Sequence, residues 1–318
     1  MSVDPSVQSA EPLRFRQATA PIVAILQELC VAIKSMASGH GHLPSANCPA
    51  MSDLAAEISM RLKLSLWETA MQDTHTFGGM TLFAGADYGS SFASLIDADE
   101  PPVYGHLVVA RAAMEASVIS AWLCDPTITP IDRLRRGLME QMYNTKEVKR
   151  LKLPGIDFEG QSARWKAVAD AFGWEVRWSN GKPIVDGATW PSIPDGISRL
   201  LARGTQVNVG KFQWSYLSAV SHVTWYGLRQ SLMDGEGGSA AMPHVVSVGT
   251  GLESVRSQAV CVLRALRNAA DARASLMGWL TPAWVELADH VKEVEIGLLV
   301  ANQNVQKARE EGETGGQP

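Results

Sequence analysis

The sequence contains little charge and no marked excess of either sign. Charged residues make up 19% of its 318 residues, and the formal net charge is -5 at pH 7. Proteins dedicated to nucleic-acid binding usually carry a strong basic excess, so the overall charge argues against that class and leaves only a local basic face open. Apolar residues reach 46%. This content excludes disorder of the whole chain and indicates helices that are buried on most of their sides.

Signatures of disulfides, metal sites and phosphate loops are also missing. The four cysteines lie far apart and form no CxxC pair, which argues against a disulfide framework or a zinc knot. A di-iron bundle would need two Glu-x-x-His motifs, and the chain has none. Neither a GxxxxGK loop nor a GxGxxG loop occurs. We therefore expect no cofactor and no metal.

Signals for export or membrane insertion are not apparent. Residues 1–12 are polar and acidic, and they lack the basic start and apolar run of a signal peptide. The most apolar stretch, residues 107–124, carries Arg111 and Glu115, and is not expected to cross a bilayer. These features predict a cytoplasmic protein without membrane contact.

Hydrophobic periodicity predicts an all-α fold. Ile22, Leu26 and Leu29 fall at helical spacing after Pro21, which suits a first helical turn. Gly78-Gly79 is expected to break a helix, and Arg264, Arg267 and Arg273 are expected on the outer face of another. We predict helices over 21–37, 52–75, 82–97, 104–124, 130–152, 161–172, 197–202, 212–233, 252–280 and 282–310.

A β-hairpin is expected inside the helical chain. Residues 174–178 alternate in character, and Ser179-Asn180-Gly181 is typical of a tight turn. An isolated hairpin is marginally stable, so this one should pack against helices. The prediction is a single-domain multi-helix bundle with a small β-hairpin insertion. The domain covers 21–310, with the insertion at about 154–204, a flexible N-terminus at 1–20 and a disordered tail at 311–318.

Arg111 and Glu115 are the most unusual polar residues of the predicted core. They are four residues apart on the most apolar helix and share one of its faces. Charges in such a place are costly unless they are paired. A structural ion pair that joins helices is the more common explanation, and a polar centre within a ligand pocket is the alternative.

Further candidates lie on the aromatic helix predicted over 212–233. Ser218 and His222 are four residues apart and could hydrogen-bond, although a catalytic serine would also need an orienting acid and an oxyanion hole. A lone histidine in this setting is usually a core residue. If Glu115 reaches His222, an Arg-Glu-His cluster forms at the centre of the bundle. The predicted ligand-binding residues are Arg111, Glu115, Tyr216, Ser218, His222 and Trp225.

Tryptophans and cations are concentrated in the middle of the chain. Six of the ten tryptophans lie between Trp165 and Trp225, where they either fill the core under the hairpin or line an apolar pocket. The nearby cations either form a solvated face or contact phosphates. They are Arg133, Arg135, Arg136, Lys146, Lys149, Arg150 and Lys152.

Two stretches resemble a known type of helical protein. Residues 106–115 end in an Arg-x-x-x-Glu pattern and are followed by Trp-Leu-Cys-Asp at 122–125, and residues 216–222 read Tyr-Leu-Ser-Ala-Val-Ser-His. Both resemble uncharacterised actinobacterial all-helical proteins that are similar in outline to HEPN-type bundles. HEPN-type RNases carry an Arg closely followed by a His, and no His of this chain follows an Arg at that spacing. The resemblance therefore implies the bundle without the RNase motif.

Three functions are compatible with the sequence. The leading hypothesis is a non-catalytic cytosolic protein that binds a small ligand or a protein partner through the central polar cluster, with a homodimer as its expected assembly. The first alternative is an enzyme, either HEPN-like or a hydrolase that uses Ser218 and His222. The second alternative is a nucleic-acid-associated regulatory or defence protein.

Overall fold

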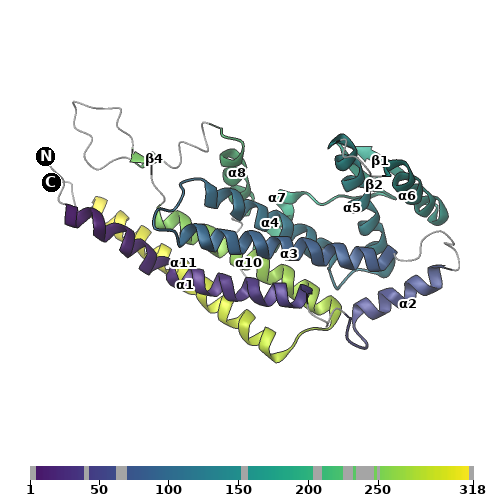
Figure 1. The fold of residues 1–318 in the computed structure, drawn as a ribbon, viewed down its shortest axis with the longest axis horizontal. Helices are drawn as coiled ribbons and strands as arrows, with labels where there is room; N and C mark the ends of the chain where they lie inside the picture. The colour runs from purple at the N-terminus through teal and green to yellow at the C-terminus, as the bar shows by residue number, and fades with distance from the viewer. Residues whose placement is uncertain are drawn as a thin grey trace.

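The computed structural model describes residues 5–38, 43–61, 70–151, 157–202, 210–224, 232–233, 247–248 and 251–314. Most of these residues are helical, and the long helices run side by side along the molecule (Figure 1). The predicted all-α bundle with a small β insertion is confirmed. The helices are α1 (Pro5–Ser38), α2 (Pro49–Arg61), α3 (Ala70–Ile96), α4 (Gly105–Leu123), α5 (Pro130–Leu151), α6 (Phe158–Phe172), α7 (Ile193–Ala202), α8 (Gly210–Ser221), α10 (Leu252–Met277) and α11 (Pro282–Thr314).

The main hydrophobic core lies between α1, α3, α4, α10 and α11. Leu26, Phe92 and Leu263 expose no surface there, and burying a side chain of this size contributes roughly 1.5–3 kcal/mol. A second apolar cluster joins α5, α6 and the sheet at one end of the molecule, around Leu138, Val168 and Val185 (Figure 1). The first cluster is the core of a long helical bundle, and the second is the core of a smaller unit formed by α5, α6 and the sheet.

The sheet contains the hairpin that the sequence predicts, plus one further strand. β1 (Val176–Ser179) pairs antiparallel with β2 (Lys182–Val185), which pairs with β3 (Ala188–Thr189). Asn180 and Gly181 connect the first two strands with φ values of 49° and 77°. Two-residue turns with positive φ match the twist of the flanking strands, and Asn-Gly is the sequence that favours them. Two shorter strands, β4 (Leu232–Met233) and β5 (Ser247–Val248), also pair with each other.

Several helix boundaries differ from the predictions. α3 begins at Ala70, inside the helix predicted over 52–75, and continues to Ile96, while α6 and α7 begin at Phe158 and Ile193, a few residues earlier than predicted. α1 is helical from Pro5, although residues 1–20 were expected to be flexible, and α11 continues to Thr314. α8 ends at Ser221, so the helix predicted over 212–233 is too long, and Val223 has a positive φ of 54°. Residues 225–231 and 315–318 lie outside the described residues.

Gly78 and Gly79 do not break a helix, because both lie within α3. A Cβ atom at Gly79 would come within 2.7 Å of Arg273 Nη2, so the glycine makes room for a guanidinium group from α10. Arg264 and Arg273 were expected to face solvent, and both are buried instead. Arg264 Nε donates to Glu295 Oε2 on α11 at 3.1 Å. Tertiary contacts therefore override two expectations that rest on local pattern.

Two helical segments, Phe15–Met36 and Gly105–Leu123, are long and apolar enough to cross a membrane. The sequence prediction considered the second segment and not the first. About half of each lies buried inside the protein, with 44% and 50% of the most apolar window covered. Core helices of soluble proteins have the same length and hydropathy, so the cytoplasmic location stays a prediction.

Close contact between α5 and α3 gives a test of this packing. Gly137 is buried on α5, and a Cβ atom there would overlap the Oγ1 atom of Thr74, whose hydroxyl donates to Ala70 O at 2.9 Å. We expect Gly137→Ala to lower the free energy of unfolding by about 1–3 kcal/mol, although alanine is the better helix former. In the matched control, Gly297→Ala, the new Cβ meets no atom within 4 Å and should stabilise α11 by up to about 1 kcal/mol. Urea unfolding of both variants measures the difference, and stabilisation by both would contradict the contact.

Candidate functional site

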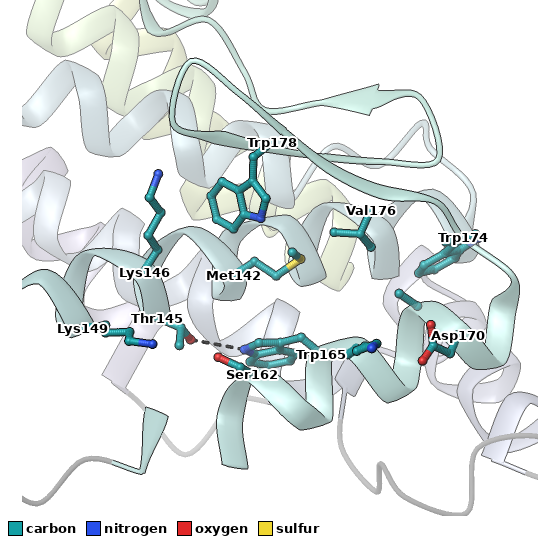
Figure 2. Close-up of a pocket in the computed structure, with 12 residues that line it drawn as sticks. Met142, Thr145, Lys146, Lys149, Ser162, Trp165, Asp170, Trp174, Val176 and Trp178 are labelled. Atoms are coloured by element: carbon teal, nitrogen blue, oxygen red, sulfur yellow. Dashed lines mark hydrogen bonds between the residues drawn. The ribbon is translucent and has the colours of Figure 1, made fainter. Parts of the chain in front are cut away.

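A cleft of about 490 Å³ opens between α5, α6 and β1 (Figure 2). This volume is within the range of small-molecule sites. One wall is a stripe of α5 that contains Met142, Thr145, Lys146 and Lys149. These positions recur at intervals of three and four residues, so one helix face carries all of them.

The opposite wall is a matching stripe of α6. It contains Ser162, Trp165, Lys166, Ala169 and Asp170. The same helical spacing places these residues on one side of α6, and Figure 2 shows the Trp165 ring lying across the floor of the cleft. The two helices therefore contribute an aromatic ring, a thioether and three amines to one space.

The hairpin region forms the third wall, with Trp174, Val176 and Trp178. Val176 and Trp178 are two residues apart on β1 and therefore point to the same face of the strand. Both are exposed, with 36% and 44% of their surface accessible. Large apolar side chains left exposed around a concavity are typical of a binding surface.

Hydrogen bonds hold the three walls together. Trp165 Nε1 donates to Thr145 Oγ1 at 3.2 Å, which ties α6 to α5. Lys146 Nζ donates to the carbonyl of Gly181 at 2.9 Å and lies 4.6 Å from the centre of the Trp178 ring. Phe172 stacks on Trp174 with 4.6 Å between ring centres. The cleft is therefore preformed by contacts among its own lining and neighbouring residues.

The charge of the lining is predominantly positive. It contains Lys146, Lys149 and Lys166 against a single carboxylate, Asp170. Lys149 and Lys166 are exposed, and in the described part of the chain neither forms an ion pair. An anionic group that enters the cleft would therefore meet two amines that are not held in an ion pair, with Asp170 four residues after Lys166 as the carboxylate of the described lining.

The structure brings Arg111 and Glu115 together, but with a partner that the sequence did not suggest. Arg111 Nε donates to Glu115 Oε1 at 2.8 Å. Trp214 Nε1 on α8 donates to the same oxygen at 3.1 Å, and the Arg111 guanidinium lies 5.5 Å from the centre of the Trp214 ring. This cluster joins α4 to α8, as expected of a structural ion pair.

His222 is not part of that cluster in the described residues. It is exposed in the turn after α8, where its backbone N–H donates to Ser218 O at 3.0 Å. No hydrogen bond joins its ring to Ser218 Oγ or to Glu115 among the described contacts. Tyr216 packs against the apolar cluster between α4, α7, α8 and α10. Trp225 lies outside the described residues.

Metal-binding geometry is not found in the part of the chain that the structure describes. No group of three or more His, Cys, Asp or Glu side chains there is placed to hold an ion.

Neither models of known protein families nor curated proteins nor solved structures give a significant match to this chain. The resemblance to HEPN-type bundles stays a prediction, and the function has to be argued from the site.

The cleft could have been found from the sequence by combining two signals. The stripes on α5 and α6 are readable as helical spacing once the helices are predicted, and the alternation of β1 places Val176 and Trp178 on one face. The sequence does not show that these three faces converge. Their approach depends on packing around Trp190, whose ring centre lies 4.5 Å from that of Tyr143 on α5.

α5 also carries a buried carboxyl group, Glu140, which is 5% exposed. Its Oε1 accepts a hydrogen bond from Asn144 Nδ2 at 2.9 Å, and its Oε2 has no partner among the described residues. Burial raises the pKa of Glu140 to about 7, and the bond from Asn144 offsets part of this effect. The folded protein therefore binds a proton on Glu140 that the unfolded chain releases near its ordinary pKa of 4.5.

This difference predicts a pH-dependent stability. The folded state holds the proton more tightly, so the stabilisation is complete below about pH 4.5 and is lost as the pH rises through about 7. Glu140→Gln removes the titrating group. The free energy of unfolding of the variant minus that of the natural protein should therefore be larger at pH 8.5 than at pH 4.5, by on the order of 3 kcal/mol. Urea unfolding over this range measures the gap, with the exposed Glu286→Gln as control. A gap that does not change with pH would contradict the burial of an ionisable Glu140.

Proposed function

We propose that this protein binds a small, flat, anionic molecule in the cleft between α5, α6 and β1, and that it does so without catalysing a reaction on it. The observation that carries the proposal is the combination of Trp165 and Trp178 with Lys149 and Lys166 around about 490 Å³. Trp174 also lines the cleft, but its ring already contacts Phe172 and Arg135. Tryptophan rings offer apolar faces to a planar ligand. Lysine amines at the rim favour a carboxylate or a sulfonate attached to that ligand.

The cleft suits such a ligand better than the Arg111 cluster does. Arg111 already has the carboxylate of Glu115 and the ring of Trp214 as partners. An incoming anion would compete with Glu115 for it. Lys149 and Lys166 require no such exchange, so an anion gains their attraction without breaking an ion pair.

The lining also favours binding over catalysis. Its hydroxyl groups belong to Thr145 and Ser162, and the Thr145 hydroxyl is already bonded to Gln161 Oε1 at 3.2 Å and to Trp165. Asp170 is eight residues from Ser162 on the same helix, a rise of about 12 Å, which is too far for a general base. Among the described residues of the lining there is no histidine and no cysteine. We therefore assign it no activated nucleophile.

Titration with 2-naphthoate tests the proposal, with 2-naphthalenemethanol as the uncharged analogue. We expect naphthoate to quench tryptophan fluorescence and to bind about tenfold more tightly than the alcohol, a difference of about 1.4 kcal/mol. The double variant Lys149→Met, Lys166→Met should lose this preference and keep the affinity for the alcohol. Lys292→Met, an exposed lysine on α11, serves as the matched control and should behave as the natural protein.

A second variant tests the place of binding. Ser162 is exposed on the α6 wall, so Ser162→Trp fills the cleft without disturbing the core and should abolish naphthoate binding. Naphthoate affinity that is unchanged by both cleft variants would refute the proposal. Stacking of single-stranded bases on tryptophans is the competing use of such a surface. Tight, salt-dependent binding of a single-stranded oligonucleotide that is lost in the double variant would favour that alternative instead.

A further inference from the structure

A second cleft, of about 570 Å³, lies between α2, α3 and α10, with Leu43 and Pro44 also in its lining. Its lining is mostly apolar, with Leu54, Met80, Phe83 and Met277, and two basic side chains, His75 and Arg273, face the same space. Met80 and Phe83 are exposed, at 63% and 40%. The cleft is therefore lined mainly by apolar side chains, and the Arg273 guanidinium adds a positive charge to its lining.

Arg273 is the unusual member of this lining, because it is 93% buried and has no carboxylate partner in the described part of the chain. Its Nη1 donates to the carbonyl of His75 at 2.8 Å and approaches Cys124 Sγ at 3.7 Å. Its Nε is buried and has no hydrogen-bond partner among the described residues. A buried charge that is incompletely paired is costly, so the site favours an anion.

Asp53, the acidic group that contacts the His75 ring, is already paired with Arg133. Asp53 Oδ2 accepts from Arg133 Nε at 2.7 Å and contacts His75 Nε2 at 2.9 Å. The Arg133 side chain is fully buried, and its positive charge is balanced by the carboxylate of Asp53. Arg273 therefore has no carboxylate partner among the described residues, and its link to this network is the carbonyl of His75.

The close approach of α3 leaves the guanidinium group of Arg273 little room to move. At Gly79 a Cβ atom would lie 2.7 Å from Arg273 Nη2 and 2.8 Å from its Cζ, and at Gly78 it would come still closer to Cys124 Sγ, at 2.5 Å. Trp279 covers the guanidinium from another side, at 5.5 Å from ring centre to Cζ. These contacts fix Arg273 at the cleft, so little ordering is required when an anion binds.

We propose that this second cleft binds an amphipathic monocarboxylate, such as a medium-chain fatty acid, with its carboxylate on Arg273 and its hydrocarbon chain along Leu54, Met80 and Phe83. Arginine presents several N–H donors in a planar fork that matches a carboxylate. The apolar members of the lining suit an alkyl chain, and Gln72 and Thr76 are the polar residues beside them. This site is independent of the aromatic cleft and does not rest on its proposed function.

A purely structural role for Arg273 is the competing explanation, because the same side chain ties α10 to the carbonyl of His75. Isothermal titration of the full chain with octanoate and with 1-octanol separates the two. We expect octanoate to bind and the alcohol to bind at least tenfold more weakly. Arg273→Met should lower octanoate affinity about ten- to hundredfold, as loss of a charge-assisted hydrogen bond predicts.

Two further variants keep the test decisive if Arg273→Met fails to fold. Thr76 is exposed at the rim of the cleft, so Thr76→Trp leaves Arg273 in place, narrows the cleft and should abolish octanoate binding. The double variant Lys149→Met, Lys166→Met should bind octanoate as the natural protein does, which separates this site from the aromatic cleft. Equal affinity for octanoate and octanol, or octanoate binding that Thr76→Trp leaves unchanged, would overturn the proposal. Absence of octanoate binding in the natural protein would overturn it as well.

Discussion

Burial of Arg133 is the constraint on which the rest of the structure depends. Its side chain is fully buried, and its guanidinium donates to Asp53, to Leu123 O and to Asp125 O, each at 2.7 Å. These bonds join the start of α5 to the end of α4 and to α2. A buried arginine whose bonds are lost would leave an uncompensated charge in the core, so the direction in which α5 leaves the bundle is strongly determined.

Because α5 is fixed in this way, the smaller end of the molecule is fixed as well. α6 and the hairpin pack on α5 through Trp165, Trp174 and Trp190. The aromatic cleft is the space left between these three elements, and its walls are held by the bonds of Thr145 and Lys146. The same arginine pairs with Asp53, which also contacts the ring of His75 in the lining of the second cleft. Arg133 is thus linked to both clefts through neighbouring residues, although it lines neither of them.

The two clefts differ in chemistry in a way that separates their ligands. The first has tryptophan faces and exposed lysine amines, which favour a flat anion. The attraction between the anion and the lysines should weaken as ionic strength rises. The second has a buried arginine under a flexible apolar rim of methionine and phenylalanine, which favours an alkyl chain with one carboxylate. Both proposed ligands are small acids, and helices form most of the walls of each cleft.

The sequence determined the elements and several local details. The spacing of apolar residues predicted most of the helices and the all-α class. The Asn180-Gly181 pair predicted the hairpin turn, in which both residues have positive φ values. It also placed Arg111 and Glu115 on one helix face, where they form an ion pair. Each of these features depends on residues within a few positions of one another, so spacing alone is sufficient to read them.

Only the tertiary structure decided which of the charged residues are buried and where the concave surfaces lie. Arg133, Arg264 and Arg273 look like solvent-facing cations on their own helices, and each is buried because a distant segment supplies its acceptor. Gly78 and Gly79 look like helix breakers, and they continue α3 because a guanidinium from α10 fills the space beside them. The reason is that the cost of burying a charge is decided by partners far away in the chain, which no local pattern contains.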